Sequence, residues 1–218
     1  MNHSAFYIPN FNGLSKNNIA LFVFWLFLLS GLIGIQFGNS DWFIEKTPLN
    51  LSVQTALVIW VFSFNKLKNL SLFFALVLLG LIAEIIGVNT SLLFGDYSYG
   101  QNLGPKVFGV PLLIGFNWAA LSIVSASLAE KTKRNNWQKA IIGATLMLII
   151  DFPLEIIANK FDFWTFPNGP GFFNYFSWGL LAFGMQFLVQ KIDFKKQPQF
   201  SLHFYLGQLF FFSFFALA

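Results

Sequence analysis

The sequence contains no cysteine, and few of its residues are charged. The absence of cysteine excludes disulfides, thiolate nucleophiles and metal sites built on thiolates. Only 10% of the residues are charged, against about 25% in soluble domains. Since 56% of the residues are hydrophobic and the mean hydropathy is +0.64, the composition excludes an ordinary soluble protein and indicates an integral membrane protein. A phosphate-binding glycine loop, a GxSxG elbow and an HExxH zinc motif are also absent from the sequence.

Apolar runs close to the length of about 20 residues that crosses a bilayer recur along the chain. They are Ile19–Phe37, Leu49–Phe64, Leu70–Val88, Val110–Leu128, Trp137–Ile157, Phe172–Val189 and Phe200–Leu217. No long polar tail or Gly/Ser linker separates them. We therefore predict an all-α polytopic integral membrane protein, with about seven transmembrane helices in one bundle and a single membrane-embedded domain over residues 1–218. The polar segment before the first run, with no small-residue cleavage site after it, indicates a retained anchor.

Basic residues are distributed unequally between the two ends of these predicted helices. The end that holds the N-terminus carries Lys16, Lys66, Lys68, Lys131, Lys133, Arg134, Lys139, Lys191, Lys195 and Lys196, and the opposite end carries only Lys46, Lys106 and Lys160. Because positive loops stay inside, we predict a cytoplasmic N-terminus in a bacterial inner membrane. The net charge of +4 then reflects topology, and it predicts membrane lipids rather than nucleic acid as partners.

Acidic residues show the reverse bias. Most of them fall at or near the predicted outer side, namely Asp41, Glu45, Glu84, Asp96, Asp151, Glu155 and Asp162, whereas only Glu130 and Asp193 fall inside. An ionisable side chain within a hydrocarbon segment costs about 2.5 kcal/mol or more, so it usually marks a functional cavity. The third and fifth predicted helices are parallel, and we expect them to aim Glu84, Asp151 and Glu155 into a shared cleft.

The first acidic stretch begins at Glu84, about one helical turn inside its apolar run. Gly87 lies one turn further along the same face and leaves space beside the carboxylate. A compact loop is predicted after it, because glycines that permit tight turns recur there, at Gly95, Gly100, Gly104 and Gly109. The alternative is an interfacial aromatic belt made by Tyr97 and Tyr99.

The second acidic stretch places Asp151, Glu155 and Asn159 on one helical stripe. Pro153 is predicted to kink this helix and to free a backbone carbonyl. Two carboxylates one turn apart repel each other when both are ionised, so one of them is expected to hold a proton near neutral pH. That state suits an acid catalyst. The alternative is a pair of structural salt bridges, with Lys160 as one partner.

Together these segments resemble a known family. The pattern comprises E-x-x-G-x-x-T from Glu84, F-G-D-Y-x-Y from Phe94, Gly104-Pro105 with Gly109-Val110-Pro111, D-x-x-x-E from Asp151, D-F-W from Asp162 and N-Y-x-x-W from Asn174. It resembles the membrane carotenoid biosynthesis proteins of the CruF type, the carotenoid 1',2'-hydratases, over about half of the chain. Ser91 and Ile156 stand where the family pattern has glycine and proline.

The resemblance implies addition of water to the terminal 1',2' double bond of an acyclic carotenoid end group, with no cofactor and no metal. Such chemistry needs a shielded proton donor and a carboxylate that holds water. Glu84 is the first candidate for the donor, and Asp151 or Glu155 for the water-holding base. Aromatic ring faces can stabilise the carbocation. The expected substrate-binding residues are Asn89, Thr90, Phe94, Asp96, Tyr97, Tyr99, Trp118, Asn159, Trp164, Asn174 and Trp178.

Other function classes share some of these features. A lycopene-cyclase-like isomerase would form the same kind of cation and quench it by ring closure. A membrane prenyltransferase would use Asp151 and Glu155 to hold magnesium and diphosphate, but it also needs clustered Lys and Arg. A proton-coupled transporter or lipid-binding membrane protein would use the acids as a relay, although they gather at one face. Homo-oligomerisation, or association with other carotenoid enzymes, is compatible with each class.

Overall fold

The computed structural model describes residues 15–64, 67–192 and 194–218. Lys66 and Asp193, which entered the charge comparison, lie outside the described residues, as do residues 1–14 of the predicted domain. Each predicted apolar run corresponds to one long helix. These helices are α1 (Lys16–Phe37), α3 (Thr47–Phe62), α4 (Leu67–Thr90), α5 (Leu112–Ala129), α6 (Asn136–Ala158), α7 (Phe172–Gln190) and α8 (Pro198–Leu217). The short helices α2 (Ser40–Ile44) and η1 (Glu130–Thr132) lie in the connections.

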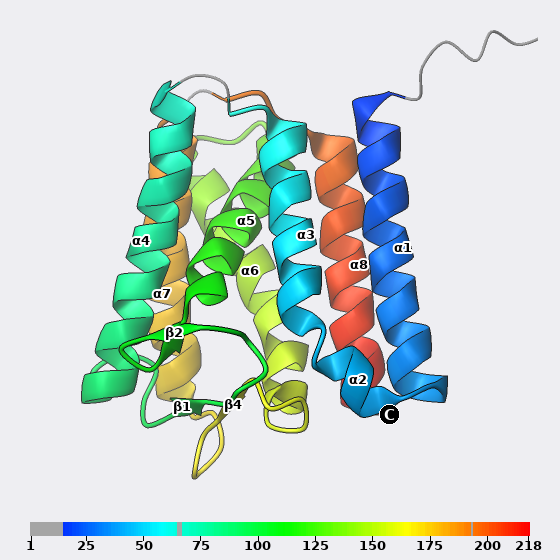
Figure 1. Ribbon diagram of the computed structural model, residues 1–218. Helices are drawn as coiled ribbons and strands as arrows, with labels where there is room; N and C mark the ends of the chain where they lie inside the picture. Colours follow the sequence, from blue (N-terminus) through cyan, green and yellow to red (C-terminus); the bar gives the residue numbers. More distant parts are fainter. Residues whose placement is uncertain (1–14, 65–66, 193) are drawn as a thin grey trace, which may run out of the picture.

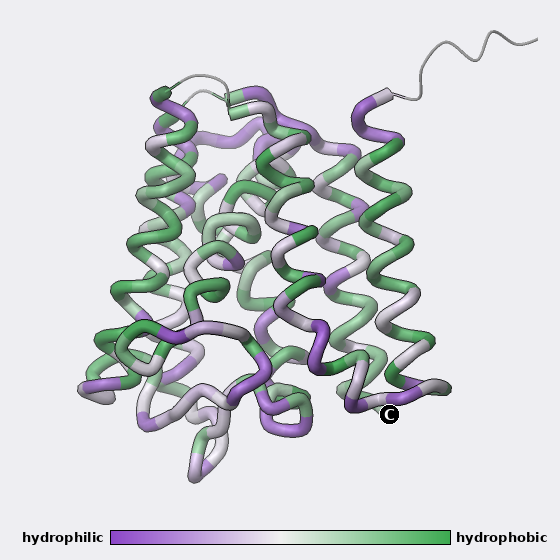
Figure 2. Tube along the Cα trace, in the orientation of Figure 1, coloured by the Kyte–Doolittle hydropathy of each residue, from purple (hydrophilic) through white to green (hydrophobic). Residues whose placement is uncertain are grey.

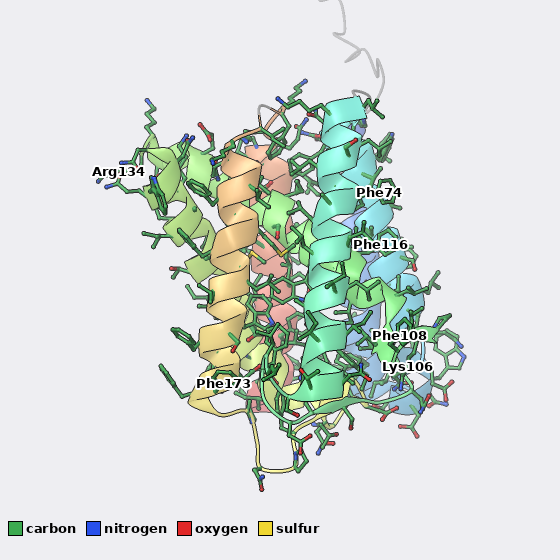
Figure 3. All side chains as sticks on the ribbon, turned by 90° about the vertical axis from the view of Figure 1, so that its left-hand side faces the viewer. Phe74, Lys106, Phe108, Phe116, Arg134 and Phe173 are labelled. Atoms are coloured by element: carbon green, nitrogen blue, oxygen red, sulfur yellow. The ribbon has the colours of Figure 1, made fainter. Side chains whose placement is uncertain are left out.

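The long helices form a bundle suited to a bilayer. Six of them are long and apolar enough to cross a membrane, and α3, with 16 residues, is shorter. Hydrophobic residues cover the middle of the bundle and hydrophilic residues gather at its two ends (Figure 2). Figure 3 shows Arg134 and Lys106 toward opposite ends of the bundle, with Phe74 of α4 at a height between them. The side chain of Phe74 is 46% exposed. The prediction of an all-α membrane bundle is therefore confirmed. The predicted count of seven spans is not confirmed, because only six of the described helices are long and apolar enough to cross a membrane.

The helices alternate in direction, so the connections divide between two ends (Figure 1). One end holds the connections α3–α4, α5–α6 and α7–α8. The opposite end holds α2, the α4–α5 loop, the α6–α7 loop and the C-terminus. Helices α4 and α6 are thus parallel, and α5 packs against both of them. Both acidic stretches consequently open toward the same end of the bundle, with α5 contributing to the space between them.

Local sequence explains several helix boundaries. The side chain of Asn135 accepts a hydrogen bond from the backbone N–H of Gln138 at 3.0 Å, which caps the start of α6. Pro198 opens α8, where the missing backbone N–H would have no intrahelical partner in any case. Pro153 lies inside α6, which continues to Ala158. Its ring nitrogen removes one intrahelical hydrogen bond without ending the helix.

Two short antiparallel strand pairs organise the loops at the acidic end. Strand β2 (Lys106–Val107) pairs with β3 (Val110–Pro111) in a tight hairpin within the α4–α5 loop. Strand β1 (Ser98–Tyr99) in the α4–α5 loop pairs with β4 (Trp164–Thr165) in the α6–α7 loop. The second pairing ties the two acidic stretches together, although they are distant in sequence.

Glycine at position 100 is required where these loops meet. A Cβ atom there would collide with the backbone oxygen and the carboxylate of Asp162. In its absence, the backbone N–H of Gly100 donates to the carbonyl of Phe163 at 2.9 Å, and the N–H of Gln101 donates to Asp162 Oδ2 at 2.7 Å. The close approach of the two loops therefore depends on the missing side chain.

Candidate functional site

A buried cavity lies where α4, α5, α6 and α7 meet the two loops. About 490 Å³ of space lies outside the protein atoms here, and this volume includes open solvent. The three carboxylates Glu84, Asp151 and Glu155 all line it. The other lining residues are Phe94, Tyr97, Tyr99, Ile114, Asn117, Trp118, Leu121, Ile150, Leu154, Trp164, Phe166, Asn174 and Trp178. The structure therefore brings the three predicted catalytic acids into one pocket.

The carboxylate of Glu84 is held by three hydrogen-bond donors. Its Oε2 accepts from the hydroxyl of Tyr97 at 2.5 Å and from that of Tyr99 at 2.8 Å. Its Oε1 accepts from the indole N–H of Trp118 at 2.9 Å. The side chain is only 4% exposed. The three donors therefore hold the Glu84 carboxyl group in one orientation within the cavity.

Two glycines on α4 make room for these donors. Gly80 and Gly87 lie one turn before and one turn after Glu84 on the same helical face. A Cβ atom at Gly80 would lie 2.7 Å from Cβ of Trp118, and one at Gly87 would lie 2.8 Å from the hydroxyl oxygen of Tyr97. The expectation that Gly87 leaves space beside the carboxylate is thus confirmed, and Gly80 has the same role on the other side.

The two tyrosines can act toward Glu84 only as donors. Burial, and then the neighbouring charge of Glu84, raise the pKa of the Tyr97 and Tyr99 hydroxyls above the usual range. Both phenols therefore keep their protons at physiological pH. The ring of Tyr97 also stacks on Phe166, with ring centroids 5.2 Å apart. These contacts fix the hydroxyls against the carboxylate.

The carboxylate of Glu155 has a separate pair of donors. Its Oε2 accepts from the indole N–H of Trp164 at 2.9 Å, and its Oε1 accepts from the side-chain amide of Asn174 at 2.8 Å. Among the described residues, the ion pair present joins Lys139 to Glu130, so Lys160 forms no salt bridge with Asp151 or Glu155. The salt-bridge interpretation of this stretch is therefore wrong. The partners of Glu155 are neutral side chains from the second loop and α7.

Asp151 differs from the other two acids. It lies one turn before Glu155 on α6 and is 2% exposed. Its Oδ2 has no hydrogen-bond partner among the described residues. A buried polar atom without a partner is uncommon and often marks a functional group. Asp151 is thus the acid of the cavity whose carboxyl is not occupied by protein donors.

Aromatic rings form another part of the cavity wall. The rings of Trp118 and Trp178 lie with centroids 4.1 Å apart at an interplanar angle of 30°. Trp118 also binds Glu84 through its N–H, so its orientation is fixed. None of the lining residues is Lys or Arg. The cavity therefore combines three acids with electron-rich ring faces, which is a surrounding suited to a transient cation and unsuited to a diphosphate.

Four predicted substrate-binding residues lie outside the cavity. Asn89, Thr90, Asp96 and Asn159 are exposed at the ends of the helices or in the loop. The amide of Asn89 donates to the carbonyls of Ile85 and Phe108, and Asn159 accepts from the hydroxyl of Thr165. The contacts of Asn89 and Asn159 tie helix ends to loops. They belong to the motifs but not to the lining of the pocket.

Six lining residues escaped the prediction, namely Ile114, Asn117, Leu121, Ile150, Leu154 and Phe166. Asn117 precedes Trp118 and lines the cavity, and a polar residue inside an apolar run was the available signal. Phe166 stacks on Tyr97, and its sequence neighbourhood holds other phenylalanines that do not line the site. No feature of the sequence separates Phe166 from them.

Comparison with known proteins yields one match. The family described as "Carotenoid biosynthesis protein" matches residues 48–218, which include all of the cavity-lining residues. No curated protein and no solved structure matches the chain.

Proposed function

The chain belongs to the carotenoid biosynthesis protein family, and from this premise we propose that it is a carotenoid 1',2'-hydratase. The enzyme adds water to the terminal double bond of an acyclic carotenoid end group. The observation that carries the proposal is the pocket in which one unpartnered carboxyl, Asp151, lies with two carboxylates held by donors, Glu84 and Glu155. Acid-catalysed hydration needs a proton donor, a group that stabilises the cation and a base that holds water, all in a site shielded from bulk water.

Asp151 is the proposed proton donor. Its carboxyl proton moves to the less substituted carbon of the double bond, and the π electrons of that bond form the new C–H bond. The adjacent carbon becomes a tertiary carbocation. Three protein donors already occupy the carboxylate of Glu84, whereas Oδ2 of Asp151 has none. This difference favours Asp151 over Glu84, the first candidate from sequence.

Glu84 and the tryptophan pair are proposed to stabilise the cation. Glu84 supplies a fixed negative charge whose orientation costs no reorganisation during the reaction. The ring faces of Trp118 and Trp178 line the same cavity. A cation over such a face gains about 0.5–2 kcal/mol.

Glu155 is proposed to hold the attacking water. Trp164 and Asn174 fix its carboxylate, which leaves lone pairs to accept a proton from water. The water oxygen bonds to the tertiary carbon and its proton passes to Glu155, which yields the alcohol. Transfer of that proton from Glu155 to Asp151, one helical turn away, restores the starting state. The atoms and charges then balance over one cycle.

Expression in a bacterial host that accumulates an acyclic carotenoid tests this proposal. Mass analysis of the extracted pigment should show a product heavier by one water. An isomerase of the lycopene-cyclase kind would change the absorption spectrum without changing the mass. A prenyltransferase would add an isoprenoid unit, and a transporter would leave the pigment unchanged. Either a pigment of unchanged mass or one enlarged by an isoprenoid unit would contradict hydration.

A further inference from the structure

A second chamber adjoins the acid cavity. It lies among α1, α3, α5, α6 and α8. About 740 Å³ of space lies outside the protein atoms here, and this volume includes open solvent. Ile114, Asn117, Leu154 and Trp164 line both spaces. Most of the remaining wall is aliphatic or aromatic, with Leu28, Ile35, Phe161, Phe163, Phe211 and Phe212 among its residues. The acid cavity and this chamber are therefore neighbours that share a wall.

One side of this chamber is a row of neutral amides. The side-chain N–H of Gln208 donates to Oε1 of Gln54, and the N–H of Gln54 donates to Oδ1 of Asn50 at 2.5 Å. Gln54 and Gln208 are only 7% and 5% exposed. The row spans α3 and α8. Its hydrogen bonds all run in one direction, because the N–H of each donating amide binds the carbonyl oxygen of the next amide. We call these three residues the amide row.

The two ends of the amide row are chemically different. At one end Nδ2 of Asn50 donates no hydrogen bond within the described residues, and at the other end Oε1 of Gln208 accepts none. Both side chains line the chamber. Each amide of the row keeps hydrogen-bonding capacity that the row does not use, because a side-chain NH2 group carries two N–H donors and a carbonyl oxygen can accept twice. Amides that line a site built for a particular polar group discriminate strongly against ligands that lack it.

The chemistry of the walls defines the ligand class. An apolar wall with a few placed polar groups is typical of a site for a mostly apolar molecule. No Asp, Glu, Lys or Arg lines the chamber, so a phosphate or carboxylate would be buried without a counterion, at high cost. Neighbouring amides of the row place unused N–H groups beside unused carbonyl lone pairs. This matches a hydroxyl, which can accept and donate at once, better than a carbonyl or ether oxygen, which only accepts.

We propose that this amide chamber is a second binding site, for an isoprenoid chain that carries a neutral hydroxyl group. The tertiary alcohol formed by hydration is one member of that class, and it would form in the adjoining acid cavity. Binding itself does not depend on the proposed reaction. Family membership supports an isoprenoid as the apolar part of the ligand.

A groove on the outer surface lies beside the chamber. It runs among α1, α2 and α3 and is lined by Leu26, Trp42 and Leu49, each at least 50% exposed. It shares Gly31, Phe43 and Asn50 with the amide chamber. Because Leu26 and Leu49 lie on apolar helices, the groove opens on the surface that faces lipid. An isoprenoid alcohol dissolved in the bilayer would therefore meet the protein next to Asn50 of the amide row.

Binding of three fifteen-carbon probes to the purified protein in lipid nanodiscs tests the proposal. The probes are farnesol, farnesyl methyl ether, which only accepts hydrogen bonds, and farnesene, which lacks oxygen. Quenching of tryptophan fluorescence measures the affinity. Since two hydrogen bonds of ordinary strength are at stake, we expect farnesol to bind about tenfold more tightly than farnesene, with the ether between them. Equal binding of all three to the unmodified protein would overturn the proposal.

The double variant Gln54→Met/Gln208→Met should remove this preference. Gln54 and Gln208 bind each other, so replacing both avoids leaving one buried glutamine amide without its partner, which limits the loss of stability. Gln190→Met is the matched control, because Gln190 donates to the carbonyl of Ala126 and lines neither space. A preference for farnesol that survives in the double variant would also overturn the proposal. If pigment hydration is found while the probes bind alike, the proposed function stands and only this inference fails.

Discussion

Tyr99 and Trp164 are register partners in the strand pair that joins the two loops, and each donates a hydrogen bond to a different acid of the cavity. Tyr99 binds Glu84 at 2.8 Å and Trp164 binds Glu155 at 2.9 Å. Their rings also meet edge to face, with centroids 5.8 Å apart. The backbone pairing of the loops thus sets the positions of both carboxylates at once. The paired loops and the two acids they bind therefore form one structural unit.

Removing a tyrosine hydroxyl should test the negative charge proposed at Glu84. Tyr99→Phe and Tyr97→Phe each delete a donor to the carboxylate, and hydrogen bonds to charged groups contribute about 1.5–3 kcal/mol. We expect hydration to fall by about tenfold or more in each variant, with the protein still in the membrane. The measurement is the yield of hydrated pigment per amount of protein. Tyr205→Phe is the control, since its hydroxyl donates to the carbonyl of Leu146 away from the cavity. Tyr variants with full activity would remove Glu84 from the mechanism.

Adding one methyl group at either α4 glycine should disturb the acid site. In Gly80→Ala and Gly87→Ala the new Cβ would press on Trp118 or Tyr97, and such overpacking costs about 1–3 kcal/mol. We expect a lower melting temperature and lower activity. Gly184→Ala on α7 is the control, because no atom lies within 4 Å of its added Cβ. Its stability should be unchanged or higher. A normal melting temperature in the α4 variants would argue against the close packing of Trp118 on Gly80 and of Tyr97 on Gly87.

Ser91 is a strained residue at the end of α4. Its φ of 54° lies in the left-handed region, where glycine is favoured and other residues lose about 1–2 kcal/mol. The glycine of the family pattern at this position is thereby explained. Ser91→Gly should raise the melting temperature of the purified protein, whereas Ser91→Ala should not. Equal melting temperatures for the glycine and alanine variants would contradict this explanation.

The sequence was sufficient to predict the positions of the long helices, because apolar runs are a local property, although only six of these helices are long and apolar enough to cross a membrane. The convergence of the three acids followed from helical spacing and from the parallel direction of α4 and α6. It could not assign the donors of each acid. Tyr97, Tyr99 and Trp118 bind Glu84 only because the α4–α5 loop folds back over α4 and α5 packs beside it. Those contacts depend on loop geometry, which composition and spacing do not determine.

The motifs also failed to separate lining residues from residues that hold the loops. Asn89 and Tyr97 belong to adjacent motifs, yet Asn89 ties α4 to the carbonyl of Phe108 while Tyr97 faces the cavity. Both roles favour polar side chains near glycine, so the sequence pattern is the same. The amide row was missed for a related reason. Its members come from α3 and α8 and meet only in the bundle.

Membrane orientation is a separate prediction. The basic connection around Lys133 and the acidic loops lie at opposite ends of the bundle (Figure 1). The excess of Lys and Arg at the first end predicts that it is cytoplasmic. Reporter fusions should be active on the cytoplasmic side at Lys133 and on the opposite side at Asp162. The reverse pattern would contradict the orientation, and reporters on one side at both positions would contradict the arrangement of helices.

The central claim is that the carboxyl of Asp151 protonates a carotenoid double bond. The most direct measurement is the yield of water-adduct pigment in a carotenoid-producing host that expresses Asp151→Asn, normalised to membrane protein and compared with the unmodified chain. The amide keeps the shape and polarity of the side chain but cannot donate an acidic proton. Abundant adduct is expected with Asp151, and essentially none with the asparagine variant. Adduct at near-normal yield from Asp151→Asn would contradict it.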